Sequence, residues 1–147
     1  QSKIYNMFKA VFFSFFLIVM CFSKVVVAEV IISNSSIKVS GGMGKAAAVF
    51  MTIVNDTDGP DRLISVRTLD FKKAMLHDTI TSTDGVVKMK HLMMGIKFSK
   101  GEEVTLESGG KHLMLMGPNK PILTGDSLKI WLNFESFGEI ETTLIVQ

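Results

Sequence analysis

A histidine and a methionine two residues apart, His112 and Met114, form the pair in this sequence that most suggests chemistry. In a β-strand, residues i and i+2 project from the same face, so both side chains would point the same way. Leu113 and Leu115 would then point to the other face, into the core. An imidazole and a thioether side by side make half of a soft-metal site, because thioethers select Cu(I) over hard cations. Taken alone, a His-x-Met pair is a weak signal.

More side chains of the same two kinds occur elsewhere in the chain. The sequence has three histidines: His77, His91 and His112. Eight of its ten methionines lie beyond residue 28, and five of these fall between Met89 and Met116. A single methionine more often fills an irregular gap in a core than it binds a metal. Met116 continues the face of Met114, where it would be either a spare ligand or a hydrophobic shield.

The only cysteine, Cys21, lies near the start of the chain, so residues 29–147 contain neither a disulfide nor a thiolate. A segment of that length buries enough apolar surface to fold without crosslinks. Any soft-metal chemistry must therefore use thioethers, which suits an oxidising compartment where exposed thiols are lost to disulfides. Blue-copper electron-transfer sites need a cysteine ligand, so the sequence argues against a redox shuttle.

Residues 1–28 are typical of a secretory signal peptide. A lysine-bearing start is followed by a long apolar run, and Ala28 is a small residue that predicts cleavage after it. One alternative is an uncleaved membrane anchor, although Lys24 interrupts the apolar run. The other alternative is lipid attachment at Cys21, but Met20 stands where a small residue is usual.

Removal of the leader changes the charge balance of the protein. The whole chain has 16 basic and 14 acidic residues, and the leader holds three of the lysines and no acid. Residues 29–147 therefore carry 13 basic and 14 acidic residues, so the high isoelectric point belongs to the leader. A nucleic-acid-binding surface should appear as a clustered basic patch, and the sequence has none.

The elements that must position the His and Met side chains are short β-strands. Runs rich in β-branched residues alternate with turn signals, which predicts an all-β antiparallel sandwich formed by one domain over residues 29–147. The alternation of Ile130, Leu132 and Phe134 with Trp131 is typical of a strand with one buried face. The predicted strands are Val30–Val39, Ala46–Val54, Arg62–Arg67, Lys73–Thr79, Val86–Met89, Glu103–Leu106, His112–Met116, Ser127–Phe134 and Glu139–Val146.

Several blocks of the sequence, taken in order, resemble the periplasmic PCuAC copper chaperones. The resemblance covers most of residues 29–147, and its most specific part is the segment from Gly109 to Gly117 around His112. The other matching blocks are Ala46–Asn55, Asp61–Val66, Leu76–Thr79 and Lys88–Lys90. Agreement of these blocks in order makes a chance His-x-Met pair a poor explanation.

The resemblance implies a cupredoxin-like β-sandwich with a Cu(I) site. Carried over by position, the family's ligands fall on His77, Met89, His112 and Met114. Each of the two gaps between these blocks is one residue longer here than in the family pattern. Either Met93 or His91 could therefore take the place of Met89.

The resemblance also implies the function. Such a protein is not an enzyme but a periplasmic carrier, which passes one Cu(I) toward the binuclear copper centre of cytochrome c oxidase. Its partner would be a Sco-type protein or the oxidase subunit, and it would contact the membrane only if the leader is uncleaved. Two other functions stay open. One is a metal-free secreted interaction module, and the other is a copper storage or resistance protein that also uses Met93, Met94 and Met116.

Overall fold

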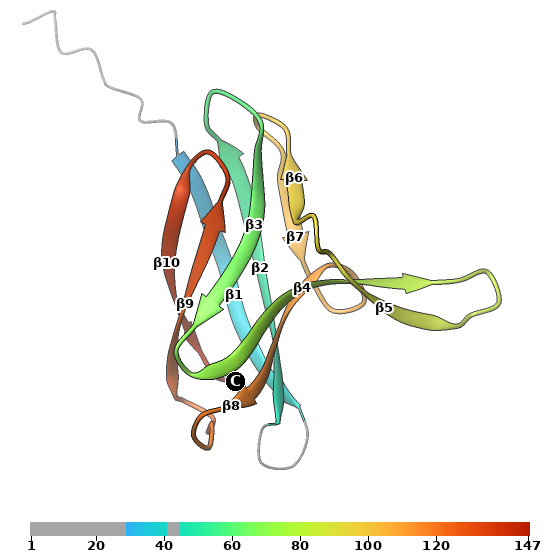
Figure 1. Cartoon of the computed structure of the whole chain (residues 1–147), viewed down its shortest axis with the longest axis vertical. Helices are drawn as coiled ribbons and strands as arrows, with labels where there is room; N and C mark the ends of the chain where they lie inside the picture. The colour runs from blue at the N-terminus through green and yellow to red at the C-terminus, as the bar shows by residue number, and fades with distance from the viewer. Residues whose placement is uncertain (1–28, 41–44) are drawn as a thin grey trace, which may run out of the picture.

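The computed structural model describes residues 29–40 and 45–147, which form two antiparallel β-sheets packed face to face (Figure 1). The six-stranded sheet has the order β1-β2-β8-β4-β5, and β7 also pairs with β2. Its strands are β1 (Glu29–Ser40), β2 (Ala46–Asp56), β4 (Phe71–Thr81), β5 (Val87–His91), β7 (Glu103–Leu106) and β8 (His112–Pro118). The four-stranded sheet has the order β10-β9-β3-β6, and comprises β3 (Asp61–Thr68), β6 (Ile96–Phe98), β9 (Ser127–Phe134) and β10 (Gly138–Ile145).

The predicted all-β antiparallel sandwich is confirmed, and every predicted strand is present with each end within two residues of its expected place. One strand was missed: β6 has three residues, too few for an alternating pattern to show in the sequence. It follows Gly95, whose positive φ of 72° allows a sharp turn. A Cβ at this position would lie 2.2 Å from the carbonyl oxygen of Leu63, so only glycine fits there. The predicted signal peptide lies outside the described residues.

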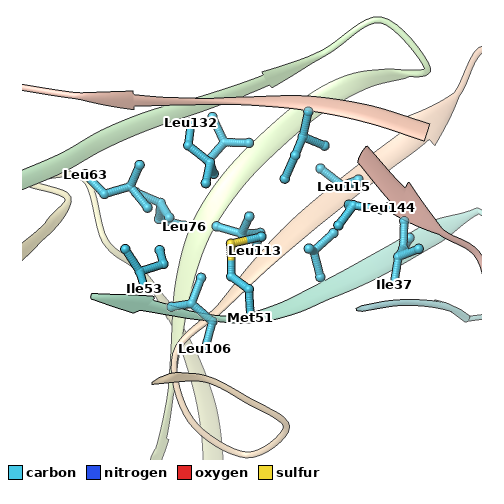
Figure 2. Close-up of a cluster of buried hydrophobic side chains, with 14 of the residues drawn as sticks. Ile37, Met51, Ile53, Leu63, Leu76, Leu106, Leu113, Leu115, Leu132 and Leu144 are labelled. Atoms are coloured by element: carbon cyan, nitrogen blue, oxygen red, sulfur yellow. The ribbon is translucent and has the colours of Figure 1, made fainter. Parts of the chain in front are cut away.

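Alternate residues of the strands fill the space between the sheets (Figure 2). On β8, Leu113 and Leu115 are fully buried, as the strand periodicity predicts. On β9, Leu128, Ile130 and Leu132 are buried in the same way. Burying one such side chain contributes roughly 1.5–3 kcal/mol, so this core fixes which face of each strand points outward. In the described residues no helix is long and apolar enough to cross a membrane.

Strand β4 changes partners halfway along its length. Its first half pairs with β8 in the body of the sandwich, and its second half pairs with β5 to form a hairpin that projects to one side (Figure 1). All five residues of β5 are exposed. His77 pairs with His112 on one side and with His91 on the other, so it stands where the body of the sandwich meets the projecting hairpin.

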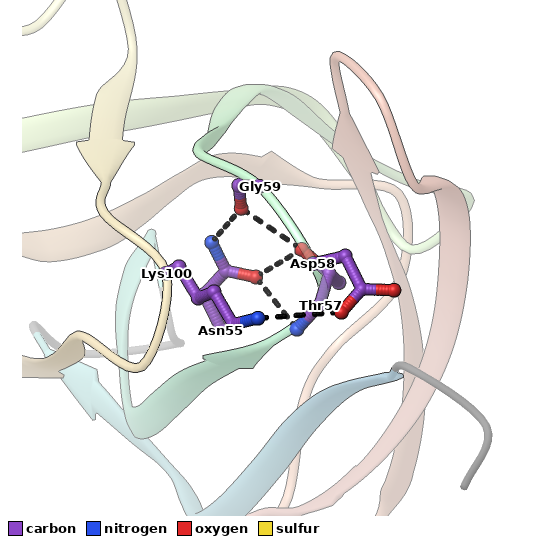
Figure 3. Close-up of polar contacts among 5 residues, drawn as sticks. All are labelled: Asn55, Thr57, Asp58, Gly59 and Lys100. Carbon is purple, nitrogen blue, oxygen red and sulfur yellow. Dashed lines mark hydrogen bonds and ion pairs between the residues drawn. The ribbon is translucent and has the colours of Figure 1, made fainter.

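A buried asparagine organises the turn between β2 and β3 (Figure 3). The side-chain amide of Asn55 donates to the carbonyl oxygens of Gly59 and Ser99, at 2.9 and 3.1 Å. Its side-chain oxygen accepts from the backbone N–H and the hydroxyl of Thr57. A side chain that satisfies its own turn in this way stabilises the loop, so Asn55 has a structural role.

Candidate metal site

Three histidines lie in a row across neighbouring strands of the six-stranded sheet. His112 on β8 is directly opposite His77 on β4, which is directly opposite His91 on β5. The ring centroid of His77 lies 5.8 Å from that of His112 and 5.6 Å from that of His91, and both pairs meet edge to face. Residues opposite each other in a sheet project from the same face, so all three rings share the outer face.

Two methionines lie next to this row because two short segments mirror each other. Met75-Leu76-His77 runs antiparallel to His112-Leu113-Met114, so methionine faces methionine, leucine faces leucine and histidine faces histidine. The two leucines are buried in the core. The two histidines and the two methionines therefore occupy the opposite, outer face. Both methionine side chains are half-buried there.

The ring of His112 is held in a defined orientation. It is 5% exposed, and its Nδ1 lies 3.0 Å from the carbonyl oxygen of Gly110. The same oxygen accepts the backbone N–H of Thr79 at 3.1 Å, which ties the loop before β8 to β4. A carbonyl oxygen can only accept, so Nδ1 of His112 carries the proton. This leaves the lone pair on Nε2, which is the arrangement usual for a metal-binding histidine.

The surroundings of His77 fit a metal ion. Its Nδ1 is shielded from solvent and has no hydrogen-bond partner among residues 29–40 and 45–147. A buried polar atom left unpaired costs roughly 1–3 kcal/mol, and a metal bound at that nitrogen would satisfy it. Burial lowers the pKa of His77 below its ordinary value, and the neighbouring His112 and His91 lower it further. The ring is therefore held in the neutral form that coordinates metals.

The predicted ligand Met89 lies at the margin of this cluster. It is opposite Thr79, one diagonal step from His77, and its side chain is 64% exposed. A diagonal neighbour in a sheet is still within reach of a long side chain. Of the two possible substitutes, His91 is directly opposite His77, whereas Met93 lies in the loop after β5 and is 81% exposed.

A small cavity adjoins the projecting hairpin at the same place. Its volume is about 190 Å³, and Met75, His91 and Met93 are among its lining residues, together with residues of β3. Met94, the next residue, is 74% exposed. Methionines therefore occur next to the projecting hairpin as well as along β8.

Met75 is the candidate ligand that the sequence analysis missed. It was one methionine among eight, and packing explained it well enough. The signal was present, since Met75-x-His77 is His112-x-Met114 read in reverse, and two such segments match when their strands pair antiparallel. That pairing was not predictable from the sequence, because Met75 and Met114 are 39 residues apart along the chain.

Among the described residues, no three His, Cys, Asp or Glu side chains are placed to hold a metal ion on their own. The thioethers of Met75 and Met114 share the outer face with the histidines, and thioethers combine with imidazoles in sites for soft metals. The arrangement brings His77, His112 and Met114 together as predicted, with Met89, Met75 and His91 around them.

The sequence of the chain is similar to those of known proteins. Residues 30–146 match the family described as putative lipoprotein LpqE-like. The putative lipoprotein Lxx21020 of Leifsonia xyli subsp. xyli (strain CTCB07) is 29% identical over 103 residues, which cover 70% of this chain and 60% of that protein. The present chain thus corresponds to less than two thirds of the length of that relative.

Solved structures share the fold. The copper-bound PCuAC domain from PmoF2 is 25% identical and superimposes with a TM-score of 0.66, covering 83% of this chain and 95% of that domain. Its apo form is 26% identical, with a TM-score of 0.64 and coverage of 83% and 92%. For Cu(I)-DR1885 from Deinococcus radiodurans, 24% identical with coverage of 84% and 83%, the TM-score of 0.61 shows a common fold. The predicted resemblance to PCuAC domains and their cupredoxin-like sandwich is confirmed, and the chain belongs to the LpqE-like family.

Proposed function

We propose that this protein is a copper carrier that binds one Cu(I) through His77, His112 and Met114, with Met89 as the fourth ligand. The observation that supports it most is the mirrored pairing of β4 with β8, which sets two imidazoles beside thioethers on an outer face. Thioethers and neutral imidazoles suit Cu(I). The copper-bound PCuAC domain from PmoF2 and Cu(I)-DR1885 support the same choice of ion.

The position of the site suits transfer of the ion rather than permanent storage. His112 is buried and oriented, whereas Met89 is mostly exposed on the projecting hairpin. One side of the bound ion would therefore face solvent, where the ligands of an acceptor could enter before those of the donor leave. Neutral ligands add no charge to the ion, which also favours exchange. No catalytic step is required of such a protein.

We place this transfer in the periplasm, toward the binuclear copper centre of cytochrome c oxidase, with a Sco-type protein or the oxidase subunit as acceptor. The names of the relatives, which are putative lipoproteins, support a location in the cell envelope. Intact-mass analysis of the exported protein tests the leader: cleavage after Ala28 leaves Glu29 as the first residue. A lipid-modified Cys21 at the terminus would contradict that cleavage site while leaving the copper site unaffected.

A competition titration against a Cu(I) chelator under anaerobic conditions tests the proposed function. We expect one Cu(I) per chain, held tightly enough to compete with the chelator. Two or more ions of similar affinity would instead favour storage through the exposed methionines, Met93, Met94 and Met116. Absence of binding would favour the metal-free interaction module.

A further inference from the structure

Strand β5 has a neighbour on only one side. It lies at one end of the six-stranded sheet and pairs with β4 alone, in the hairpin that projects from the body of the sandwich (Figure 1). All five of its residues, Val87–His91, are exposed. At the other end of the same sheet, β1 is bridged to Val146 through Ile37, so that edge is partly closed. The open edge of β5 is a place where an extended chain can add to the sheet.

The register of the hairpin decides which backbone groups of β5 point to the open side. Just beyond the strand, the N–H of Leu92 donates to the carbonyl oxygen of Leu76 at 2.8 Å. Hydrogen-bonded and non-hydrogen-bonded residues alternate along an antiparallel pair. Counting back from Leu92, the even-numbered residues of β5 bond to β4, so Val87, Met89 and His91 point their N–H and C=O groups outward. No other described segment of the chain pairs with these groups.

The side chains of β5 alternate between the two faces of the hairpin. Val87 and Met89 share the outer face with the histidines and are 60% and 64% exposed. Lys88 and Lys90 point to the opposite face. Lys90 lies opposite Asp78 of β4, but neither lysine forms an ion pair within the part of the chain that the structure describes. The open edge therefore offers apolar side chains on one face and two positive charges on the other.

The two lysines determine which kind of chain fits this edge. If a second copy of the protein paired antiparallel with Met89 opposite its counterpart, Lys88 of each copy would face Lys90 of the other. Like charges directly opposite each other destabilise a pair of strands, and lysines protect many edge strands from such self-association. An acidic residue at either position would instead be attracted to the lysine it faces. The charge of the edge thus disfavours a second copy and favours an acidic strand.

We propose that the open edge of β5 binds an extended segment of another protein, antiparallel, in which two acidic residues alternate with apolar ones. The acidic side chains would face Lys88 and Lys90. Backbone hydrogen bonds to Val87, Met89 and His91 would hold the segment, and its alternating side chains would select it. The inference goes beyond copper transfer and does not depend on it, although the bound segment would lie beside Met89, on the face of the proposed copper site.

Nuclear magnetic resonance of the metal-free, isotope-labelled protein, purified after export, tests the proposal. The probe is an end-capped synthetic peptide, Thr-Val-Glu-Val-Glu-Val-Thr, whose glutamates would face the two lysines. At saturation we expect it to slow hydrogen exchange of the N–H groups of Val87, Met89 and His91 by about tenfold or more, because hydrogen-bonded N–H groups are protected. The N–H groups of Lys88 and Lys90 already bond to β4, so their exchange should change by less than about twofold.

Matched controls separate strand pairing from general charge attraction. N-methylation of the three valines removes the N–H groups that would face β5 and should abolish binding, whereas N-methylation of the two glutamates should lower affinity by less than about threefold. Lys88→Glu should weaken binding of the unmodified peptide by about fivefold or more, because a repulsive pair replaces an attractive one. Lys38→Glu makes the same change of charge on β1, at the other end of the sheet, and should bind within about twofold of the wild type.

Three results would overturn the proposal. One is unchanged hydrogen exchange at millimolar peptide. Another is equal binding of the two N-methylated peptides, or an equal loss in Lys88→Glu and Lys38→Glu, since the peptide would then not be held as a strand facing the lysines. The third is protection that rises with protein concentration in the absence of peptide, which would assign the edge to a second copy. Failure of the proposed function is a separate result, because it appears as absent Cu(I) binding and leaves this test unaffected.

Discussion

The two sheets present outer faces of opposite chemical character. On the four-stranded sheet, Arg67 pairs with Glu139 at 2.7 Å and lies 4.2 Å from the ring centre of Trp131. Trp131 in turn donates its indole N–H to Glu141, which also pairs with Lys129. These polar groups are paired with one another.

The outer face around β8, β4 and β5 is different. It carries three imidazoles, one of which has a shielded nitrogen with no partner among the described residues, and sulfur atoms lie on the same face. Such a group raises the free energy of the folded protein unless something binds to it. The contrast teaches that polar side chains paired with one another on an outer face have a structural role. An unpaired donor atom among potential ligands indicates a binding site instead.

The largest effect is expected from His112→Ala, which removes the most firmly oriented of the proposed ligands. Changes next to a metal ligand cost about 10–100-fold in affinity, so loss of the ligand itself should cost about 100-fold or more in Cu(I) affinity. Chelator competition measures it, and thermal unfolding of the metal-free protein shows whether the fold persists. If a folded His112→Ala variant keeps full Cu(I) affinity, the proposed copper site is wrongly placed. The outer face of the six-stranded sheet would then have no more claim to a function than that of the four-stranded sheet.

Acidification is expected to have the next largest effect. Copper needs neutral imidazoles, and burial holds the pKa of His77 below its ordinary value of 6.5. Protonation of His77 therefore competes with copper binding mainly at pH values below 6.5. We expect Cu(I) affinity to fall by about tenfold or more between about pH 7 and pH 5, mostly toward pH 5. A titration series over this range measures it. A flat profile would remove the histidines from the ligand set, since thioethers do not titrate there.

The same shift has a consequence for the metal-free protein. The unfolded chain takes up a proton on His77 near pH 6.5, whereas the folded protein takes it up at a lower pH. Within that window the unfolded state binds more protons, so the free energy of unfolding falls as the pH falls. Bound copper should extend this dependence to lower pH, because it keeps the folded state from taking up the proton that the unfolded state still binds.

Met114→Leu should weaken Cu(I) binding by about tenfold without unfolding the protein. Exchanges between leucine and methionine usually cost less than about 1.5 kcal/mol in stability, so the loss would report on the sulfur. Met116→Leu is the control, because Met116 lies on the same face of β8 but outside the predicted ligand set. Equal losses in both variants would point to general packing on this face rather than to coordination.

A smaller effect should identify the fourth ligand. Met89 is the expected one, but Met75 lies directly opposite Met114. If Met89→Leu lowers Cu(I) affinity and Met75→Leu does not, the predicted set holds. The reverse result would move the site from the hairpin to the body of the sandwich, and no loss in either would direct attention to Met93 and the cavity it lines.

The case of Met75 shows which part of this molecule the sequence could predict. Alternation along one strand is local, so it correctly placed His112 and Met114 outward and Leu113 inward. Runs of β-branched residues between turn signals are also local, and they located nine of the ten strands in the described residues. Which strands become neighbours depends on packing between distant segments, and only that packing brings Met75 opposite Met114. The resemblance to a family indicated His77 and Met89 as ligands. It did not indicate the strand register, which places Met89 opposite Thr79 rather than opposite His77.

The smallest effect on Cu(I) affinity is expected from substitutions on the four-stranded sheet. They test whether the paired groups of its outer face have only a structural role. Arg67→Met removes the charge but keeps an unbranched side chain that can cover Trp131, and Glu139→Gln removes the partner charge. Both residues are largely exposed, so their ion pair is screened by solvent and contributes little. We expect the double variant to unfold within about 2 °C of the wild type and to bind Cu(I) within about twofold of it, because distant sites act independently. A marked loss of copper affinity in this variant would mean that the two faces are coupled through the core, and pairing on a surface would no longer separate structure from function.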